Sequence, residues 1–374
     1  MARLVARGLS FGLAALAALA ACTVPAQPAA VQPVASPAAA NPARAAPTRP
    51  IQLWAFTRLH GTDYVAVQDI ARSFGLKAAW TKPEVILSLS DARGVRFIFE
   101  GNQKDFYFDG LRIFLGAPAL VHRDGLWISR LDVIKIVAPL FRPADHLDRI
   151  PVIDSRTIVL DPGHGGIDPG TENKRLGLNE KTNTLDVALR TKKILELMGW
   201  RVLLVRSDDR ELSRDKKTDL FMRDEFANRN RADLFLSIHF NAAPQAITGI
   251  ETYAMTPQSM LSTGSETADE MTKVAYPGNR LDYANLLFGE QLHRAMRSTL
   301  KTPDRGYKRG RHAVLRMLDC PGALVECAYL SNDAEARRVA TPEFRQLIAE
   351  GIAKGVQDYA DAVAALRSDP PGGG

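Results

Sequence analysis

Four residues of this 374-residue chain stand at or near the ends of predicted strands or at a helix start and have side chains that could bind a metal or transfer a proton. They are His164 in DPGHGG, Glu180 in LNEKTN, His239 in LFLSIHFN and Glu326 in ALVECAYL. Two imidazoles and a carboxylate are a sufficient ligand set for a catalytic zinc ion, which keeps a fourth position for water. A further carboxylate would be needed to move the proton. The residue types therefore point to metal-assisted hydrolysis.

Each of these residues also has a structural interpretation. A single histidine near a strand end is often structural, and Glu180 suits the first turn of a helix, where the macrodipole favours an acid. No HExxH helix is present, so spacing alone does not select the ligands. The glycines around His164 allow a tight backbone. Asp161 is either a group that supports the metal site or a turn residue.

Strands and helices that would position these residues alternate from residue 157 onward. We expect strands at 157–160, 201–205, 234–239, 249–254, 313–317 and 323–328, and helices at 183–198, 220–230, 282–300 and 342–364. This order predicts an α/β fold with a mostly parallel sheet and helices on both faces. In such sheets, ligands collect beyond the strand ends.

Residues 51–142 show a different pattern. The stretch YVAVQDIA, which begins at Tyr64, returns as WISRLDVI at Trp127, and each copy predicts a strand followed by a helix with Asp69 or Asp132 at its start. Short strands are also expected at 85–89, 95–100 and 106–115, with a turn at Asp109-Gly110. This small α+β domain resembles the N-terminal stalk domain of copper amine oxidases. We interpret His60 and His122 as surface histidines.

The chain begins with a predicted export signal at residues 1–22. Arg3 and Arg7 precede an apolar stretch that is too short to span a membrane comfortably. It ends in LAAC, which resembles the bacterial lipobox, so we expect lipidation of Cys22; the alternative is an ordinary signal peptide. By resemblance to Gram-negative lipoproteins, Thr23 in place of an aspartate favours anchoring to the outer membrane, so we expect the protein in the periplasm. Residues 23–50 form an Ala/Pro-rich segment, predicted to be a disordered tether.

Composition and charge narrow the classes of partner. The chain is 46% hydrophobic and 24% charged, with a net charge of +6, and is long enough for two domains. A basic balance is compatible with nucleic acid, but export makes anionic envelope polymers the expected partners. Export also permits a disulfide between Cys320 and Cys327. Because Cys327 lies in an apolar run, free buried thiols are the favoured prediction.

Several motifs together resemble the zinc-dependent N-acetylmuramoyl-L-alanine amidases of the Amidase_3 type. In chain order they are DPGHGG, NEK, FMRDEFAN, ADLFLSIHFNA, GIETY and DRGYKRGRHAVLRMLDCPGALVECAYLSN. The resemblance implies that His164, Glu180 and His239 bind one Zn²⁺ per chain and that Glu326 is the catalytic general base, then acid. It implies a peptidoglycan hydrolase that cleaves the amide between the lactyl group of N-acetylmuramic acid and L-alanine.

Composition and the resemblance together suggest domain limits, and the resemblance suggests a regulatory feature. We expect a linker at 143–156, a catalytic domain at 157–366 and a disordered tail at 367–374. Residues 256–282 form a polar insert. It is either a surface loop or a lid that an activator protein displaces, with Glu266 or Glu270 as the blocking carboxylate.

Some assignments stay open at this point. Arg223 and Asn241 lie in family motifs, but Arg223 could be a helix ion-pair residue and Asn241 a turn residue or substrate contact. A zinc peptidase acting within the stem peptides or their cross-links would use the same metal chemistry. A non-catalytic cell-wall-binding protein would keep the fold and lose the ligands, all of which are present here.

Overall fold

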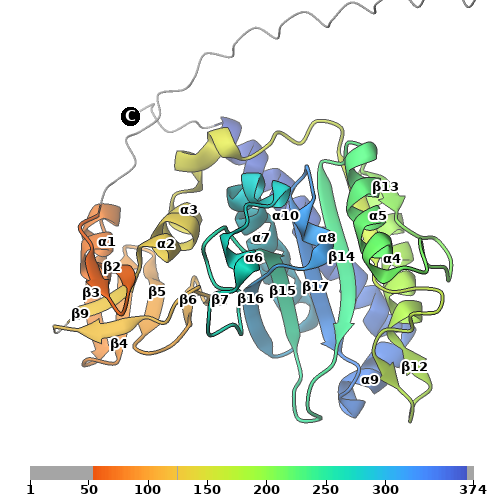
Figure 1. Ribbon diagram of the computed structural model, residues 1–374, viewed down its shortest axis with the longest axis horizontal. Coiled ribbons are helices and arrows are strands. Elements are labelled where there is room, and N and C mark those ends of the chain that lie inside the picture. Colours follow the sequence, from red (N-terminus) through yellow and green to blue (C-terminus); the bar gives the residue numbers. More distant parts are fainter. Residues whose placement is uncertain (1–53, 124, 369–374) are drawn as a thin grey trace, which may run out of the picture. The chain divides into compact units, whose positions relative to one another are not determined.

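The computed structural model describes residues 54–123 and 125–368, which belong to one compact unit (Figure 1). The predicted signal peptide, Cys22 and the tether lie outside the described residues, as does the tail from residue 369. In the part of the chain that is described, no helix has both the length and the apolar composition needed to cross a bilayer. The predicted domain limits stay predictions.

The N-terminal part contains a small antiparallel sheet. Its strands, in spatial order, are β1 (Thr57–Leu59), β2 (Thr62–Ala66), β9 (Gly125–Ser129) and β8 (Leu120–His122). Each copy of the internal repeat forms a strand followed by a helix, as predicted: β2 leads into α1 (Val67–Phe74) and β9 into α2 (Arg130–Asp132). A π-helical turn η1 (Val133–Val137), α3 (Ala138–Phe141) and a 3-10 segment η2 (Pro143–Arg149) follow.

The two repeat aspartates have different surroundings. Asp69 lies in the first turn of α1, as predicted. Asp132 is buried, and its carboxylate accepts hydrogen bonds from the backbone N–H groups of Gly116 (2.7 Å) and Ala117 (3.2 Å). The side chain of Ser129 caps the helix. The Asp132 carboxylate therefore connects the loop at Gly116 and Ala117 to the first turn of α2.

The remaining N-terminal strands form an antiparallel series. They are β3 (Lys77–Lys82), β4 (Ile86–Asp91), β5 (Gly94–Glu100), β6 (Asp105–Phe108) and β7 (Leu111–Phe114). Alternate phenylalanines on β5 and β6 point to one face and their rings pack against one another there, as the two-residue period of a strand requires.

This series continues into the sheet of the C-terminal part. The further strands, in spatial order from the far edge, are β13 (Arg201–Leu204), β10 (Thr157–Pro162), β14 (Leu234–Asn241), β17 (Gly322–Tyr329), β15 (Ile250–Met255) and β16 (Asp304–Gly310). β13, β10, β14 and β17 are parallel, β15 is antiparallel to β17, and β16 is parallel to β15. β16 pairs with β7, so a single mixed sheet of 11 strands results.

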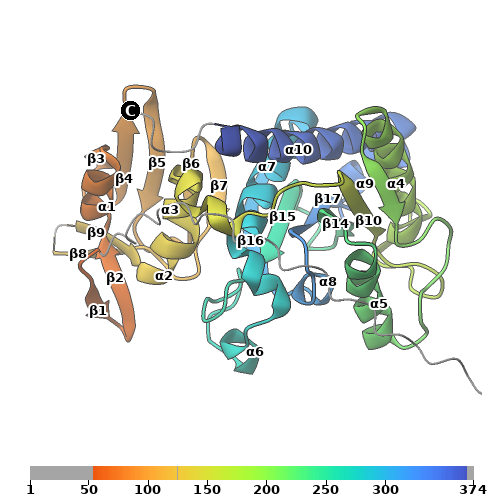
Figure 2. The same cartoon turned by 90° about the horizontal axis from the view of Figure 1, so that it is seen from above.

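Helices cover both faces of the C-terminal strands, as predicted (Figure 2). One face carries α4 (Glu180–Leu197), α7 (Asp282–Leu300) and α10 (Pro342–Ser368), and the other carries α5 (Lys216–Arg229) and α8 (Ala313–Arg316). Ile158 and Leu160 of β10 belong to the first core, whereas Val159 belongs to the second. Alternate residues of the strands are therefore buried on both faces. A hairpin of β11 (Glu172–Asn173) and β12 (Leu178–Asn179) precedes α4, and α9 (Asp333–Ala340) precedes α10.

Two local strand predictions were wrong. Residues 313–317, predicted as a strand, contain the helical turn α8, and Ala, Leu, Arg and Met are all good helix formers. Strand β16 was missed because its sequence DRGYKRG is highly charged. The sheet accommodates it because Arg305 and Lys308 pair with Glu251 of the neighbouring strand. Helix α10 extends to Ser368 and so includes the first two residues of the predicted tail.

Candidate metal centre and its supporting contacts

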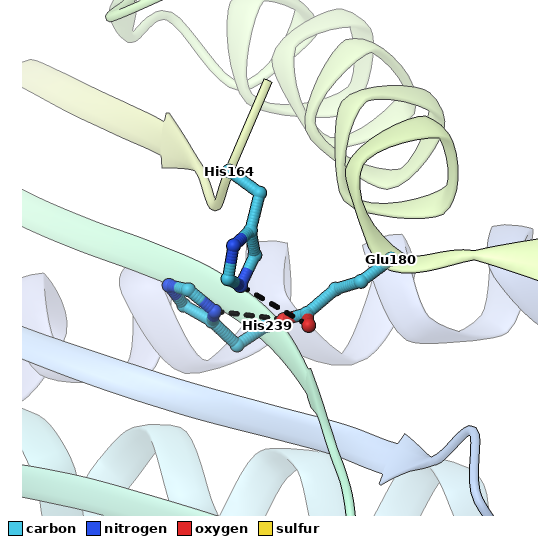
Figure 3. Close-up of side chains that lie close together, drawn as sticks. All are labelled: His164, Glu180 and His239. Atoms are coloured by element: carbon cyan, nitrogen blue, oxygen red, sulfur yellow. Dashed lines mark hydrogen bonds and ion pairs between the residues drawn. The ribbon is translucent and has the colours of Figure 1, made fainter. Parts of the chain in front are cut away.

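His164, Glu180 and His239 come together at the ends of three different elements (Figure 3). His164 follows β10, Glu180 is the first residue of α4 and His239 lies near the end of β14. One ligand atom from each lies within 4.8 Å of the others, and within the described ranges this is the group suited to a metal ion. The three positions singled out in the sequence therefore converge.

The Glu180 carboxylate lies between the two imidazole rings. Its Oε1 is 2.8 Å from Nδ1 of His239, and its Oε2 is 3.1 Å from Nε2 of His164. The backbone N–H groups of Thr171 and Phe240 also donate to it. Burial alone would raise the pKa of Glu180, but the hydrogen bonds and charges of the two histidines hold it well below its usual range. The carboxylate is therefore ionised and faces both imidazoles.

His164 adopts an unusual backbone conformation that surrounding residues maintain. Its φ is +63°, in the left-handed region. Its Nδ1 lies 2.9 Å from Oδ2 of Asp168, which also pairs with Lys216. A carboxylate that is hydrogen-bonded to the second nitrogen of a metal-binding histidine fixes the orientation of the ring and raises its basicity as a metal ligand. Sequence reasoning missed Asp168, although its position four residues after His164, in a turn-forming DPG, was an available signal.

Glycines next to the cluster leave room for its side chains. A Cβ at Gly163 would lie 2.3 Å from Cε1 of the His239 ring, and one at Gly170 would lie 2.6 Å from both Glu180 Oε2 and His164 Cδ2. Any other residue at these positions would displace the three converging side chains.

Asp161 and Arg223 form a buried ion pair behind the cluster. Asp161 accepts from Nη1 of Arg223 (2.7 Å) and from the hydroxyl of Ser237 (2.8 Å). Arg223 also pairs with Asp219 (2.9 Å) and donates to the backbone carbonyl of His164 (3.1 Å). Arg223 thus links α5 to the loop that carries His164. The roles of Asp161 and Arg223, which the sequence left open, are therefore structural: Arg223 holds the loop that carries His164, and Asp161 holds Arg223.

Glu326 lies beside His239. The two residues are register partners on the parallel strands β14 and β17, and Glu326 is also the register partner of Glu251 on β15. The Oε2 atom of Glu326 is buried and has no hydrogen-bond partner among the described residues. Burial, together with the negative charges of Glu180 and Glu251, raises the pKa of Glu326 well above its usual value. This carboxyl group therefore has a strong tendency to take up a proton.

Glu251 is the centre of a buried polar network next to Glu326. Its carboxylate pairs with Lys308 and accepts from the hydroxyl groups of Tyr253 (2.7 Å) and Tyr329 (2.5 Å). Asn241 donates to it as well, at 3.1 Å. Sequence reasoning did not assign a role to Glu251, although it lies in the GIETY motif. Nothing in the sequence indicated that it would lie opposite Glu326.

Among the described residues, the other histidines and the cysteines considered in the sequence do not belong to the metal-binding group. Within residues 54–123 and 125–368, the metal-binding group includes neither His60 nor His122. His60 is exposed and has a positive φ. Cys320 and Cys327 are free and buried, as predicted.

The insert at 256–282 contains a short helix α6 (Glu270–Lys273) and a 3-10 turn η3 (Pro277–Leu281). Met260 is buried in the core of the N-terminal part, and the backbone carbonyl of Ser265 accepts from Lys104 (2.9 Å). Glu266 and Glu270 are both exposed. Among the described residues, neither acid belongs to the metal-binding group, so the structure gives no support to a blocking carboxylate.

Comparison with known proteins identifies relatives of this chain. Residues 158–358 match the Amidase_3 family, described as N-acetylmuramoyl-L-alanine amidase. The chain is 34% identical over 224 residues to the N-acetylmuramoyl-L-alanine amidase AmiC of Neisseria meningitidis, with 54% of this chain and 52% of that protein covered. It is 31% identical over 230 residues to the germination-specific N-acetylmuramoyl-L-alanine amidase of Bacillus subtilis, with 59% and 84% covered.

A solved structure also resembles part of the chain. The catalytic domain of CwlV, an N-acetylmuramoyl-L-alanine amidase from Bacillus (Paenibacillus) polymyxa var. colistinus, is 29% identical, with a TM-score of 0.45 and with 55% of this chain and 98% of that domain covered. The chain spans about half or less of the length of the first curated relatives. The family match nevertheless covers more than half of this chain, from β10 to α10, and includes all four candidate site residues. The chain therefore belongs to the N-acetylmuramoyl-L-alanine amidase family.

Proposed function

We propose that the protein is a zinc-dependent peptidoglycan amidase that cleaves the bond between N-acetylmuramic acid and the L-alanine of the stem peptide. The observation that carries this proposal is the convergence of His164, Glu180 and His239 beside Glu326 within the family-matched residues. We assign the three converging residues as ligands and Glu326 as the catalytic carboxylate.

The donor set suits zinc. Two imidazole nitrogens and one carboxylate oxygen are the ligands of many catalytic zinc sites, and a fourth position stays open in such sites. The ligand atoms already face one another, and Asp168 supports the far nitrogen of His164. When bound, zinc supplies Lewis acidity, which polarises the scissile carbonyl and lowers the pKa of a bound water.

Glu326 is placed to handle the proton of the reaction. Its free Oε2 accepts a proton from the attacking water, and the resulting carboxylic acid donates it to the departing nitrogen of L-alanine. An amine is a poor leaving group without this proton. The surroundings that raise the pKa of Glu326 favour the first transfer, and Glu251, held by its own partners, keeps a fixed negative charge nearby.

Mass spectrometry of digested sacculi tests the proposal. Stem peptides that begin at L-alanine, together with glycan free of peptide, are the expected products. Shorter peptides with muramic acid still attached would instead indicate a peptidase, and the absence of products would indicate a binding protein.

The location of the protein belongs to the same proposal. The signal at residues 1–22 and the lipobox support export to the periplasm and anchoring to the outer membrane through a lipid on Cys22. Residues 23–50 would then tether the catalytic part to the membrane. The N-terminal part is proposed to be a domain of the copper amine oxidase stalk type that positions the catalytic part on peptidoglycan. The partner that we propose for this basic chain is peptidoglycan, and not nucleic acid.

A further inference from the structure

Arg206 is buried in an unusual way. It follows β13, is 1% exposed and is the largest of the fully buried side chains among the described residues. Its guanidinium donates to four backbone carbonyls and one hydroxyl group instead of a carboxylate. A buried charge is costly unless it is well bonded, so this arrangement requires all of these acceptors to be held in place.

The acceptors belong to the two segments that carry His164 and Glu180. Arg206 donates to the carbonyls of Pro162 (3.0 Å) and Gly163 (2.9 Å), the two residues before His164. It also donates to the carbonyl of Lys181 (2.8 Å), the residue after Glu180.

Thr184 reinforces this bridge. Its hydroxyl accepts from Nη2 of Arg206 (3.2 Å) and lies 2.9 Å from the carbonyl oxygen of Gly163, to which it donates. Three acceptors from two separate segments therefore surround one nitrogen of the guanidinium.

Arg223 cannot substitute for this contact. It reaches the carbonyls of Pro162 and His164 but pairs with Asp161 and Asp219, so it connects the His164 loop to β10 and α5. Its hydrogen bonds do not reach the segment after Glu180.

We propose that Arg206 is a positioning residue that fixes the separation of His164 and Glu180 and so preforms the metal centre. The inference rests on the proposed zinc site, because it concerns two of its ligands. A planar guanidinium can reach carbonyls of both segments at once, whereas the ammonium group of a lysine is a single point of contact. Arg206→Lys should therefore keep the positive charge but lose the bridge.

The test measures zinc affinity of the full chain after removal of metal, by competition with a chromophoric chelator. Outer contacts of metal ligands typically contribute about 10–100-fold to metal affinity, so Arg206→Lys should weaken zinc binding by about tenfold or more. The matched control is Arg309→Lys. Arg309 is also buried, at 3% exposed, but it donates to the carbonyl of Lys308 and stacks on Tyr307, away from the ligand segments. This control should lower the melting temperature and keep wild-type zinc affinity.

A second variant covers the case in which Arg206→Lys does not fold. Thr184→Val keeps the shape of the side chain but removes the hydroxyl group, and it should weaken zinc binding by a smaller factor. Wild-type zinc affinity in a folded Arg206→Lys protein, or in Thr184→Val if only that variant folds, would overturn the inference. A wild-type chain that binds no zinc would overturn both the inference and the metal centre. Because zinc affinity is the readout, failure to digest sacculi would refute only the proposed reaction.

Discussion

His239 and Glu326 occupy matched positions on the adjacent parallel strands β14 and β17. Residues in register on neighbouring strands point to the same face of a sheet, so the backbone itself places the proposed ligand His239 beside the proposed proton-transfer group Glu326. This pairing separates two tasks that can be tested independently, metal binding and proton transfer.

Glu326→Gln should abolish proton transfer without loss of metal. General acid–base groups typically contribute about 10²–10⁴-fold, so turnover on sacculi should fall by that factor, while zinc content and melting temperature stay near wild type. The matched control is Glu335→Gln. Glu335 is a buried glutamate that accepts from the backbone N–H groups of Gly249 and Tyr329, so its substitution should affect mainly stability. Turnover of Glu326→Gln within about tenfold of wild type, below the usual contribution, would remove Glu326 from the mechanism.

Removal of the metal should stop the reaction. Chelation should abolish hydrolysis and added zinc should restore it, and His239→Ala should lose both zinc and activity because one of three protein ligands is missing. His122→Ala is the control, since His122 lies outside the cluster, and it should retain zinc and activity. Activity that persists in a chelator-treated, metal-free preparation would contradict the ligand assignment.

The acids of the insert should not inhibit the proposed hydrolysis. Glu266 and Glu270 are exposed, and Glu270 pairs only loosely with Lys273 (3.5 Å). Glu266→Gln and Glu270→Gln, alone and combined, should therefore leave the basal hydrolysis of sacculi unchanged. These substitutions are better tests than deletion of the insert, because deletion would also remove the buried Met260. A clear rise in basal activity would restore the lid hypothesis.

Asp224 should make stability depend on pH. Burial raises its pKa to about 8, and nearby Asp161 contributes to the rise. Between the ordinary value of 3.8 and 8 the folded chain binds a proton that the unfolded chain lacks, so this group lowers stability as the pH rises through that window. The slope approaches roughly 1.4 kcal/mol per pH unit.

Asp224→Asn, which stays neutral, should remove this slope. The measurement is the free energy of unfolding in urea at pH 5 and pH 8. The difference between variant and wild type should shift in favour of the variant from pH 5 to pH 8. Asp358→Asn is the control, because Asp358 is a half-buried residue of α10 that pairs with Lys354, and it should show the wild-type pH dependence. Parallel curves for the wild type and Asp224→Asn would contradict the prediction.

The sequence predicted the elements around the centre better than the contacts between them. Strands such as β10 and β14 are short apolar runs buried on both faces, so their composition identifies them. Strand β16 could not be found in this way, because it is highly charged and its Arg305 and Lys308 pair with Glu251, more than fifty positions away in sequence. Its strand character depends on a partner that local composition does not reveal.

The contacts that support the metal centre could not be predicted either, because most of them join residues that are far apart in the sequence. Arg206 bonds to carbonyls 44 and 43 residues earlier in the chain, and carbonyl acceptors leave no trace in the amino-acid sequence. Asp168 was closer to detection, since it lies only four residues from His164. The pairing of Glu326 with Glu251 required the strand order, in which β17 lies between β14 and β15.

The pairing of β7 with β16 bears on solubility. An unpaired strand at the border of a sheet offers free N–H and C=O groups to other chains and promotes aggregation. Within the C-terminal part alone, β16 would be such a border strand, but it pairs with β7. The edge of the sheet on this side is instead β3, which is largely exposed and has lysines at both ends, Lys77 and Lys82. Lysines at an edge strand discourage pairing with strands of other chains. The N-terminal part therefore pairs β16 and leaves the lysine-bearing β3 at the edge in its place.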